Sequence, residues 1–136
     1  MPLTRLDHCA IRTAKLEETK DFYTDALGLS IGDRPDFPFP GYWLYLGDTA
    51  VVHLVGIDPD DPQGLIDTLG EVDIDSLAGT GSFDHVAFTA GDAPELLDRL
   101  RRLGVPFRER QVPDLDLFQV FLEDPNGVTI EVNYFA

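Results

Sequence analysis

The chain has 136 residues, of which 43% are hydrophobic, so it is long enough to form one compact domain with its own core. Its 25 acidic and 10 basic residues give a formal net charge of −15, which argues against nucleic acid and anionic membranes as partners, because both require clustered Lys and Arg. The sequence contains no apolar run of the ~20 residues that span a bilayer, and its first residues, Met1 to Arg5, lack the apolar run typical of a signal peptide. Its single cysteine, Cys9, excludes an internal disulfide. We therefore expect a cytoplasmic protein in which any metal site uses His and carboxylate ligands.

The first half of the chain reads as one strand, one helix and three further strands. Alternation over residues 6–12 indicates a strand, and the helical spacing of apolar residues over 16–27, followed by Gly28, indicates a helix. Three strand-like segments follow at residues 29–33, 42–46 and 50–57, separated by turn-rich sequence. The predicted order is βαβββ.

The second half repeats this order. Residues 83–89 are predicted as a strand and residues 93–103 as a helix, with Pro94 near its start and Gly104 after its end. Further strands are predicted at residues 105–111, 117–123 and 128–134. The sequence thus predicts an α+β fold in a single domain, with one βαβββ module at about 4–57 and another at about 83–136. The acidic segment 58–82 is predicted to connect them and to be able to act as a lid.

All three histidines occupy matching places in the two modules. His8 and His85 are 77 positions apart, and His53 and Glu131 are 78 positions apart. A repeat at one such period indicates duplicated structural units, in which matching side chains can surround one site. The four side chains form a nitrogen and oxygen ligand set suited to one divalent ion: Fe(II), Mn(II), Ni(II), Co(II) or Zn(II).

Side-chain alternation along the strands gives each ligand candidate small or polar neighbours on its own face. These neighbours are Ala10 and Arg12 for His8, Ala87 and Thr89 for His85, and Thr129 and Asn133 for Glu131. The opposite parity is apolar and is expected to lie beneath the helices. Carrying the register into the third strands matches Trp43 and Tyr45 with Gln119 and Phe121. These four side chains, with Arg12 and Asn133, are the predicted substrate-binding residues; the alternative for the aromatic ones is ordinary sheet packing.

Four segments carry a resemblance to a known family: Leu6-Asp7-His8, Phe22-Tyr23 followed by Leu27-Gly28-Leu29, Phe83-Asp84-His85, and Asp124-Pro125-Asn126-Gly127 followed by Glu131. With them the sequence resembles the vicinal-oxygen-chelate (VOC) superfamily, which includes glyoxalase I, extradiol ring-cleaving dioxygenases, methylmalonyl-CoA epimerase, fosfomycin resistance proteins and bleomycin-binding proteins. The resemblance implies two modules that form an open, barrel-like mixed sheet around one divalent metal ion, commonly in a homodimer.

Residue by residue, the resemblance implies particular roles. His8, His85 and Glu131 match the two histidines and the glutamate that hold iron in extradiol dioxygenases. His53 stands where glyoxalase I usually has Glu and the epimerase has Gln, so it is either a fourth ligand or an acid/base group. The resemblance implies a metal enzyme with Glu131 and His53 as catalytic residues, acting on a small substrate with two neighbouring oxygens.

Among the possible reactions, the match to the iron ligands favours ring-cleaving dioxygenation with Fe(II), with a glyoxalase-like lyase or an epimerase as the alternative. An alternative of another class is a metal-free protein that sequesters an aromatic or cationic drug near Trp43, Tyr45 and Phe121, since the chain is acidic.

Overall fold

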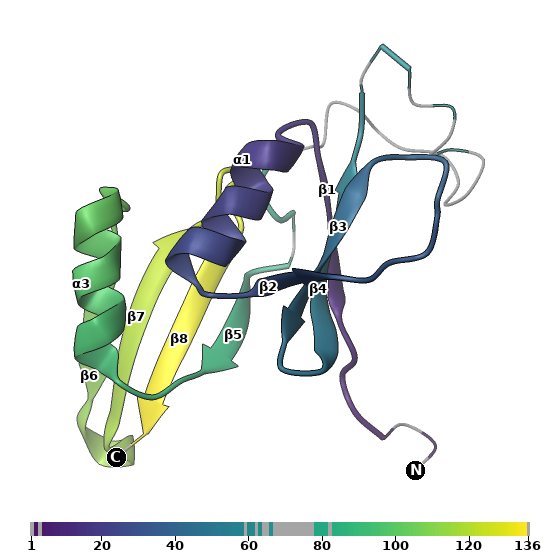
Figure 1. Cartoon of the computed structure of the whole chain (residues 1–136). Coiled ribbons are helices and arrows are strands. Elements are labelled where there is room, and N and C mark those ends of the chain that lie inside the picture. The colour runs from purple at the N-terminus through teal and green to yellow at the C-terminus, as the bar shows by residue number, and fades with distance from the viewer. Residues whose placement is uncertain are drawn as a thin grey trace. The chain divides into compact units, whose positions relative to one another are not determined.

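The computed structural model of the chain, shown in Figure 1, describes residues 2, 4–58, 60, 61, 63, 66, 78–81 and 83–135. Most of the predicted connector, and with it the predicted lid, lies outside the described residues. The chain divides into two compact units, Met1–Leu77 and Ala78–Ala136, and each unit contains one of the predicted modules. Within the described ranges, no helix is both long enough and apolar enough to cross a membrane.

The first unit contains β1 (Cys9–Thr13), α1 (Leu16–Asp21), the π-helix η1 (Phe22–Ala26), β2 (Ser30–Gly32), β3 (Gly41–Leu46) and β4 (Thr49–Gly56). Its strands lie in the order β1-β4-β3-β2; β1 runs parallel to β4 and the other neighbours are antiparallel. The predicted βαβββ order is confirmed. The predicted helix is also present, but its second half is wound as a π-helix, which apolar spacing alone does not reveal.

The second unit contains β5 (His85–Thr89), α3 (Ala93–Leu103), β6 (Arg108–Val112), the 3₁₀-helix η3 (Pro113–Leu115), β7 (Leu117–Glu123) and β8 (Thr129–Phe135). Its strand order, β5-β8-β7-β6, repeats the topology of the first sheet. β6 begins three residues later than predicted. The N–H of Val105 donates to the carbonyl of Leu100 at the end of α3, and Pro106 has no N–H to give to a sheet.

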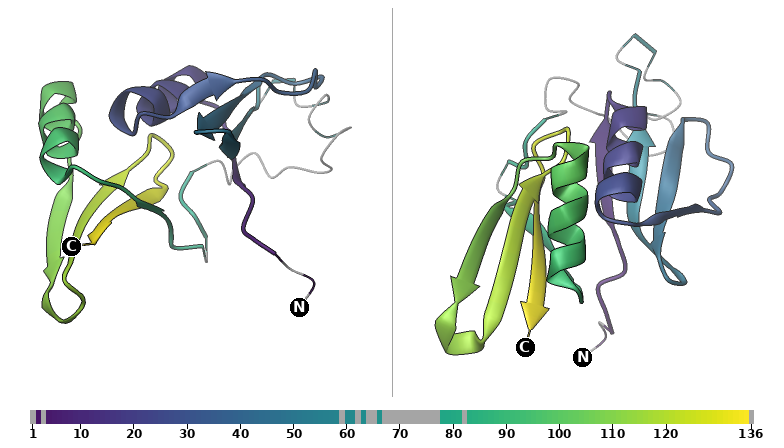
Figure 2. Two further views of the ribbon diagram at one scale, coloured as in Figure 1. Left: turned by 60° about the horizontal axis from the view of Figure 1, so that its bottom comes forward. Right: turned by 60° about the vertical axis from the view of Figure 1, so that its left-hand side comes forward.

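Each sheet buries the apolar parity of its strands. In the first unit Val52 and Leu54 of β4 are 1% exposed, and α1 packs on β3 and β4. In the second unit Val120 of β7 and Ile130 of β8 are fully buried, as is Leu100 of α3, which lies beside this sheet in Figures 1 and 2. The α+β fold of two βαβββ modules is therefore confirmed. In each sheet, the face with the polar side chains is the one available for a functional site.

Candidate functional site

The strand registers place the candidate ligands at equivalent positions in the two units. In the first unit Ala10 of β1 pairs with His53 of β4, and in the second unit Ala87 of β5 pairs with Glu131 of β8. His8 lies one residue before β1, on the parity of Ala10, whereas His85 is the first residue of β5. The repeat predicted from the spacing of these residues therefore exists in the strand pairing.

The third strands require one correction. Trp43 pairs with His53, and Phe121 pairs with Glu131, so Trp43 corresponds to Phe121. The predicted matching of Trp43 with Gln119, and of Tyr45 with Phe121, is wrong by two positions. Two residues separate β3 from β4 whereas five separate β7 from β8, and the register also shifts between Leu44 and Tyr45. Counting back from the turns therefore misaligns the two strands.

An aspartate orients the first histidine of each unit. His8 Nδ1 donates to Asp7 Oδ2 over 2.8 Å, and His85 Nδ1 donates to Asp84 Oδ2 over the same distance. Because a carboxylate only accepts, each Nδ1 carries the proton and each Nε2 keeps its lone pair for a metal ion. The hydrogen bond to Asp84 raises the pKa of His85, and the bond from His8 lowers the pKa of Asp7. The sequence prediction omitted both aspartates, although the repeated Asp-His pair marks them.

In the second unit, His85 and Glu131 face each other. Their closest atoms, His85 Nε2 and Glu131 Oε1, are 3.6 Å apart, and the Glu131 side chain is only 14% exposed. Asn133 Nδ2 donates to Glu131 Oε2 over 2.8 Å, and Gln119 Nε2 donates to Asn133 Oδ1 over 3.0 Å. Two ligands at about 2.0–2.2 Å from one ion lie roughly 3.0–3.5 Å apart. A movement of a few tenths of an ångström would therefore let this pair share an ion.

In the first unit, three aromatic rings form a stack. His53 lies between His8, at 3.7 Å between ring centroids and 10° between planes, and Trp43, at 4.0 Å and 12°. His53 Nε2 donates to the carbonyl of Ala50 over 3.0 Å, which leaves the lone pair on Nδ1. Burial, followed by the neighbouring charge of His8, lowers the pKa of His53. A metal ion lies in the plane of each imidazole that binds it, so two stacked parallel rings cannot both bind the same ion.

The donor chemistry fits a divalent ion, with one restriction. Among the residues that the structure describes, no group of three or more His, Cys, Asp or Glu side chains is arranged to hold a metal. Each unit instead offers a pair, His8 with His53 and His85 with Glu131. Because its rings are stacked, the first pair can give an ion one histidine nitrogen at a time, whereas the second pair offers one histidine nitrogen and one carboxylate; both are donor types that suit Fe(II) and other divalent metals.

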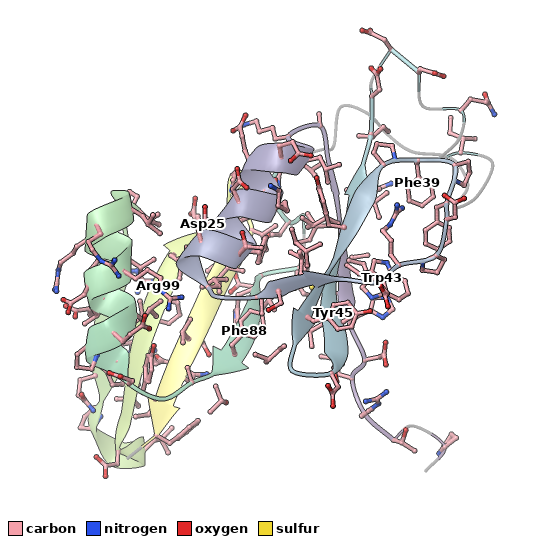
Figure 3. The ribbon with its side chains drawn as sticks, in the orientation of Figure 1. Asp25, Phe39, Trp43, Tyr45, Phe88 and Arg99 are labelled. Carbon is pink, nitrogen blue, oxygen red and sulfur yellow. The ribbon has the colours of Figure 1, made fainter. Side chains whose placement is uncertain are left out.

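The remaining predicted substrate residues lie on the polar parity of the two sheets. Tyr45 donates its hydroxyl proton to the carbonyl of Asp33 over 2.6 Å, and Arg12 is exposed on β1. Figure 3 shows Trp43 and Tyr45 in the region of the first sheet. In the second unit, Phe121 lines a hollow of about 470 Å³. The guanidinium carbon of Arg108 lies 4.4 Å from the centre of the Phe121 ring.

These features can be compared with known proteins. The family model of the Glyoxalase/Bleomycin resistance protein/Dioxygenase superfamily, the VOC superfamily, matches residues 5–132. The chain belongs to this superfamily. Among curated VOC relatives, lactoylglutathione lyase from Pseudomonas putida is 26% identical and the alignment covers 93% of this chain and 82% of the relative. The enzyme of the same name from Neisseria meningitidis serogroup B is 27% identical, with 93% and 88% covered.

Solved VOC structures share the fold. A glyoxalase family protein from Bacillus anthracis superposes with a TM-score of 0.72 at 19% identity, covering 98% of this chain and 97% of that protein. A variant of the fosfomycin resistance protein FosX from Listeria monocytogenes, complexed with Mn(II) and 1S,2S-dihydroxypropylphosphonic acid, superposes with a TM-score of 0.71 at 13% identity, covering 98% and 94%. At these identities the likeness shows the fold alone.

Proposed function

We propose that this VOC protein is a divalent-metal-dependent enzyme that acts on a small substrate with two neighbouring oxygens, by lyase or isomerase chemistry. The observation that carries the proposal is the pair His85 and Glu131, whose ligand atoms are 3.6 Å apart. Asp84 and Asn133 hold this pair in place through hydrogen bonds of 2.8 Å. In this proposal His8, with its own aspartate, supplies the third ligand.

The chain's own residues would perform the following tasks. A bound divalent ion would polarise the substrate oxygens and stabilise the negative charge that develops on them. Asn133 fixes Oε2 of Glu131, so that Oε1 is the atom directed at His85. His53 presents an unprotonated Nδ1, because its Nε2 proton is given to Ala50, and this nitrogen can accept a proton. We propose Glu131 and His53 as the catalytic residues on these grounds.

Relatives at 26–27% identity named lactoylglutathione lyase support the choice of lyase or isomerase chemistry. Ring-cleaving dioxygenation with Fe(II) is the second candidate. One observation favours it: the stack removes either His53 or His8 from the ligand set, and two histidines with one carboxylate is the set used by non-haem Fe(II) oxygenases. His53 becomes a fourth ligand only if the stack opens.

Metal content, measured by mass spectrometry on anaerobically purified protein, tests the proposal. The wild type should hold near-stoichiometric metal, a His85→Ala variant should lose it, and an Asp98→Asn variant on the exposed surface of α3 should keep it. Nickel, cobalt, zinc or manganese together with lactoylglutathione formation would support the lyase. Iron together with oxygen uptake on catechols would support the dioxygenase. Absence of metal, with no uptake on reconstitution, would contradict both and leave a metal-free binding protein.

A homodimer is also part of the proposal, because the resemblance to VOC proteins implies one. Sedimentation of the purified protein at micromolar concentration should give the mass of two chains, and a single-chain mass at all concentrations would contradict it.

A further inference from the structure

The loop between β2 and β3 lies on the same sheet face as His53. Phe39 of this loop forms a buried cluster with Val55 and Ile57, and Phe37 packs against that cluster. Val55 is two residues after His53 in β4, so its side chain shares the His53 face, because successive side chains alternate along a strand. The loop therefore forms a wall beside the proposed ligands of the first unit.

This loop holds the guanidinium of Arg34 in a fixed place. Arg34 Nη2 donates to the carbonyl of Phe39 over 3.1 Å. The guanidinium carbon lies 5.2 Å from the centre of the Phe37 ring and 5.6 Å from that of Phe39, and the two rings stack 5.1 Å apart. A Cβ added at Gly41 would stand 3.2 Å from Nη2, so the guanidinium also lies against the start of β3. Figure 3 marks Phe39 beside this strand.

Arg34 is held without a counter-ion. Within the described part of the chain no carboxylate pairs with it, although Asp33 and Asp36 are close to it in the sequence. Its Nε is buried and has no hydrogen-bond partner among the described residues. A partly desolvated charge of this kind is unfavourable unless an opposite charge approaches it, and a planar guanidinium recognises carboxylates well.

The position of Arg34 relative to the stack limits the size of a ligand. Gly41, against which the guanidinium lies, precedes Trp43 by two residues along β3, a separation of about 7 Å. Trp43 in turn stacks on His53. A planar group lying along the Trp43 side of this face can therefore carry a carboxylate at one end to Arg34 while its other end approaches the histidines.

We propose that Arg34 binds the carboxylate of the substrate, and that the substrate is a small planar organic acid. The carboxylate site stands on the loop geometry alone. Its role in catalysis rests on the proposed function, because only then does the other end of the acid meet a metal ion. Aromatic neighbours and an uncompensated arginine together favour an aryl carboxylate over a neutral aromatic molecule.

The test uses metal-free protein in chelator, with benzoate as the probe and benzyl alcohol as its neutral counterpart. In a ¹H–¹⁵N NMR titration, benzoate should give saturable shifts of the Arg34 Nε–H and of amides in residues 33–43, and benzyl alcohol should bind at least tenfold more weakly. Arg34→Gln should weaken benzoate about tenfold or more and leave benzyl alcohol unchanged. Arg34→Lys keeps the charge but not the planar donors, so its affinity for benzoate should lie between those of the wild type and Arg34→Gln.

Arg102→Gln is the matched control, because Arg102 is an exposed arginine of α3 and should bind benzoate as the wild type does. The proposal is overturned by equal binding of the two probes, by benzoate affinity that survives Arg34→Gln in a variant with a folded spectrum, or by the absence of saturable shifts. Chelator is present throughout, so a failure here is separate from a failure of metal uptake, which would count against the proposed function instead.

Discussion

Replacing Asp84 by Asn tests whether the aspartates before the histidines prepare them for a metal ion. The substitution removes the charge that accepts the His85 Nδ1 proton over 2.8 Å, so His85 becomes a weaker ligand. Loss of such a partner costs about 10- to 100-fold in metal affinity, or about 1.4–2.7 kcal/mol. The Asp84 side chain is 92% exposed, so solvent screening places it near the tenfold end. Asp7 is 57% exposed, and Asp7→Asn should cost more.

The assay is calorimetric titration of apo protein with the metal found in the native protein, using a competing chelator where binding is tight. Asp98→Asn is the control, because Asp98 makes only an exposed 3.5 Å ion pair with Arg101 and should leave metal affinity within twofold. Unchanged affinity in both Asp84→Asn and Asp7→Asn would refute the reasoning, since both histidines would then bind metal without an oriented tautomer.

Four further predictions concern proton binding and stability. In an NMR titration of metal-free protein, His85 should become protonated before His53 as the pH falls. The hydrogen-bonded aspartate raises the pKa of His85, whereas burial lowers the pKa of His53, so the reverse order would contradict the environments described. Because the folded-state pKa of His53 is depressed, its contribution to stability is present above pH ~6.5 and is lost as the pH falls through that folded-state pKa. In urea titrations from pH 8 to 5, the free energy of unfolding should therefore fall less in His53→Gln than in the wild type, and an equal fall in both would count against this role of His53. Gly104→Ala should lower the free energy of unfolding in urea by about 1 kcal/mol, because Gly104 ends α3 at φ 69°, a conformation that favours glycine. Gly91→Ala, with open space around it, should be near neutral, and equal effects of the two substitutions would refute the role of Gly104 as the end of the helix. Asn133→Ala should cost about 1–3 kcal/mol, because it leaves both of its hydrogen-bond partners unpaired, and a cost below 0.5 kcal/mol would show that water replaces it.

The sequence predicted the fold well where residues that begin or end a helix or strand are clear. The bounds of α3 and β7 agree to the residue with those predicted, because Pro94 and Gly104 bracket the helix and the strand is a mostly apolar run that ends at Glu123, just before the Asp124–Gly127 turn. It failed where a local signal competes with tertiary context. Apolar spacing does not distinguish a π-helix from an α-helix at Phe22–Ala26. The strand-like composition near Val105 does not reveal that its N–H donates to the carbonyl of Leu100 at the end of the preceding helix.

The site was predictable as a set of positions and not as a geometry. The spacing of His8, His53, His85 and Glu131 identified equivalent places, and the strand pairing confirms that equivalence. Ring orientation depends on side-chain rotamers and hydrogen-bond partners, which spacing does not contain. The stack of the two histidines of the first unit, and the arginine held by the β2–β3 loop, could therefore emerge only from the structure.

The stack also sets a threshold for metal uptake. An ion that uses both His8 and His53 can bind only the fraction of molecules in which the rings have separated, so the measured affinity is the intrinsic affinity multiplied by that fraction. If the contact is worth about 0.5–1.5 kcal/mol, the separated fraction is roughly 7–30%, which weakens apparent binding about 3- to 14-fold. An ion that uses His8 and not His53 avoids this cost only if His8 binds the ion without leaving the stack. The number of histidines that bind the ion thus depends on the equilibrium between stacked and separated rings. Trp43, the only tryptophan in the chain, stacks on His53, so its fluorescence can report that equilibrium.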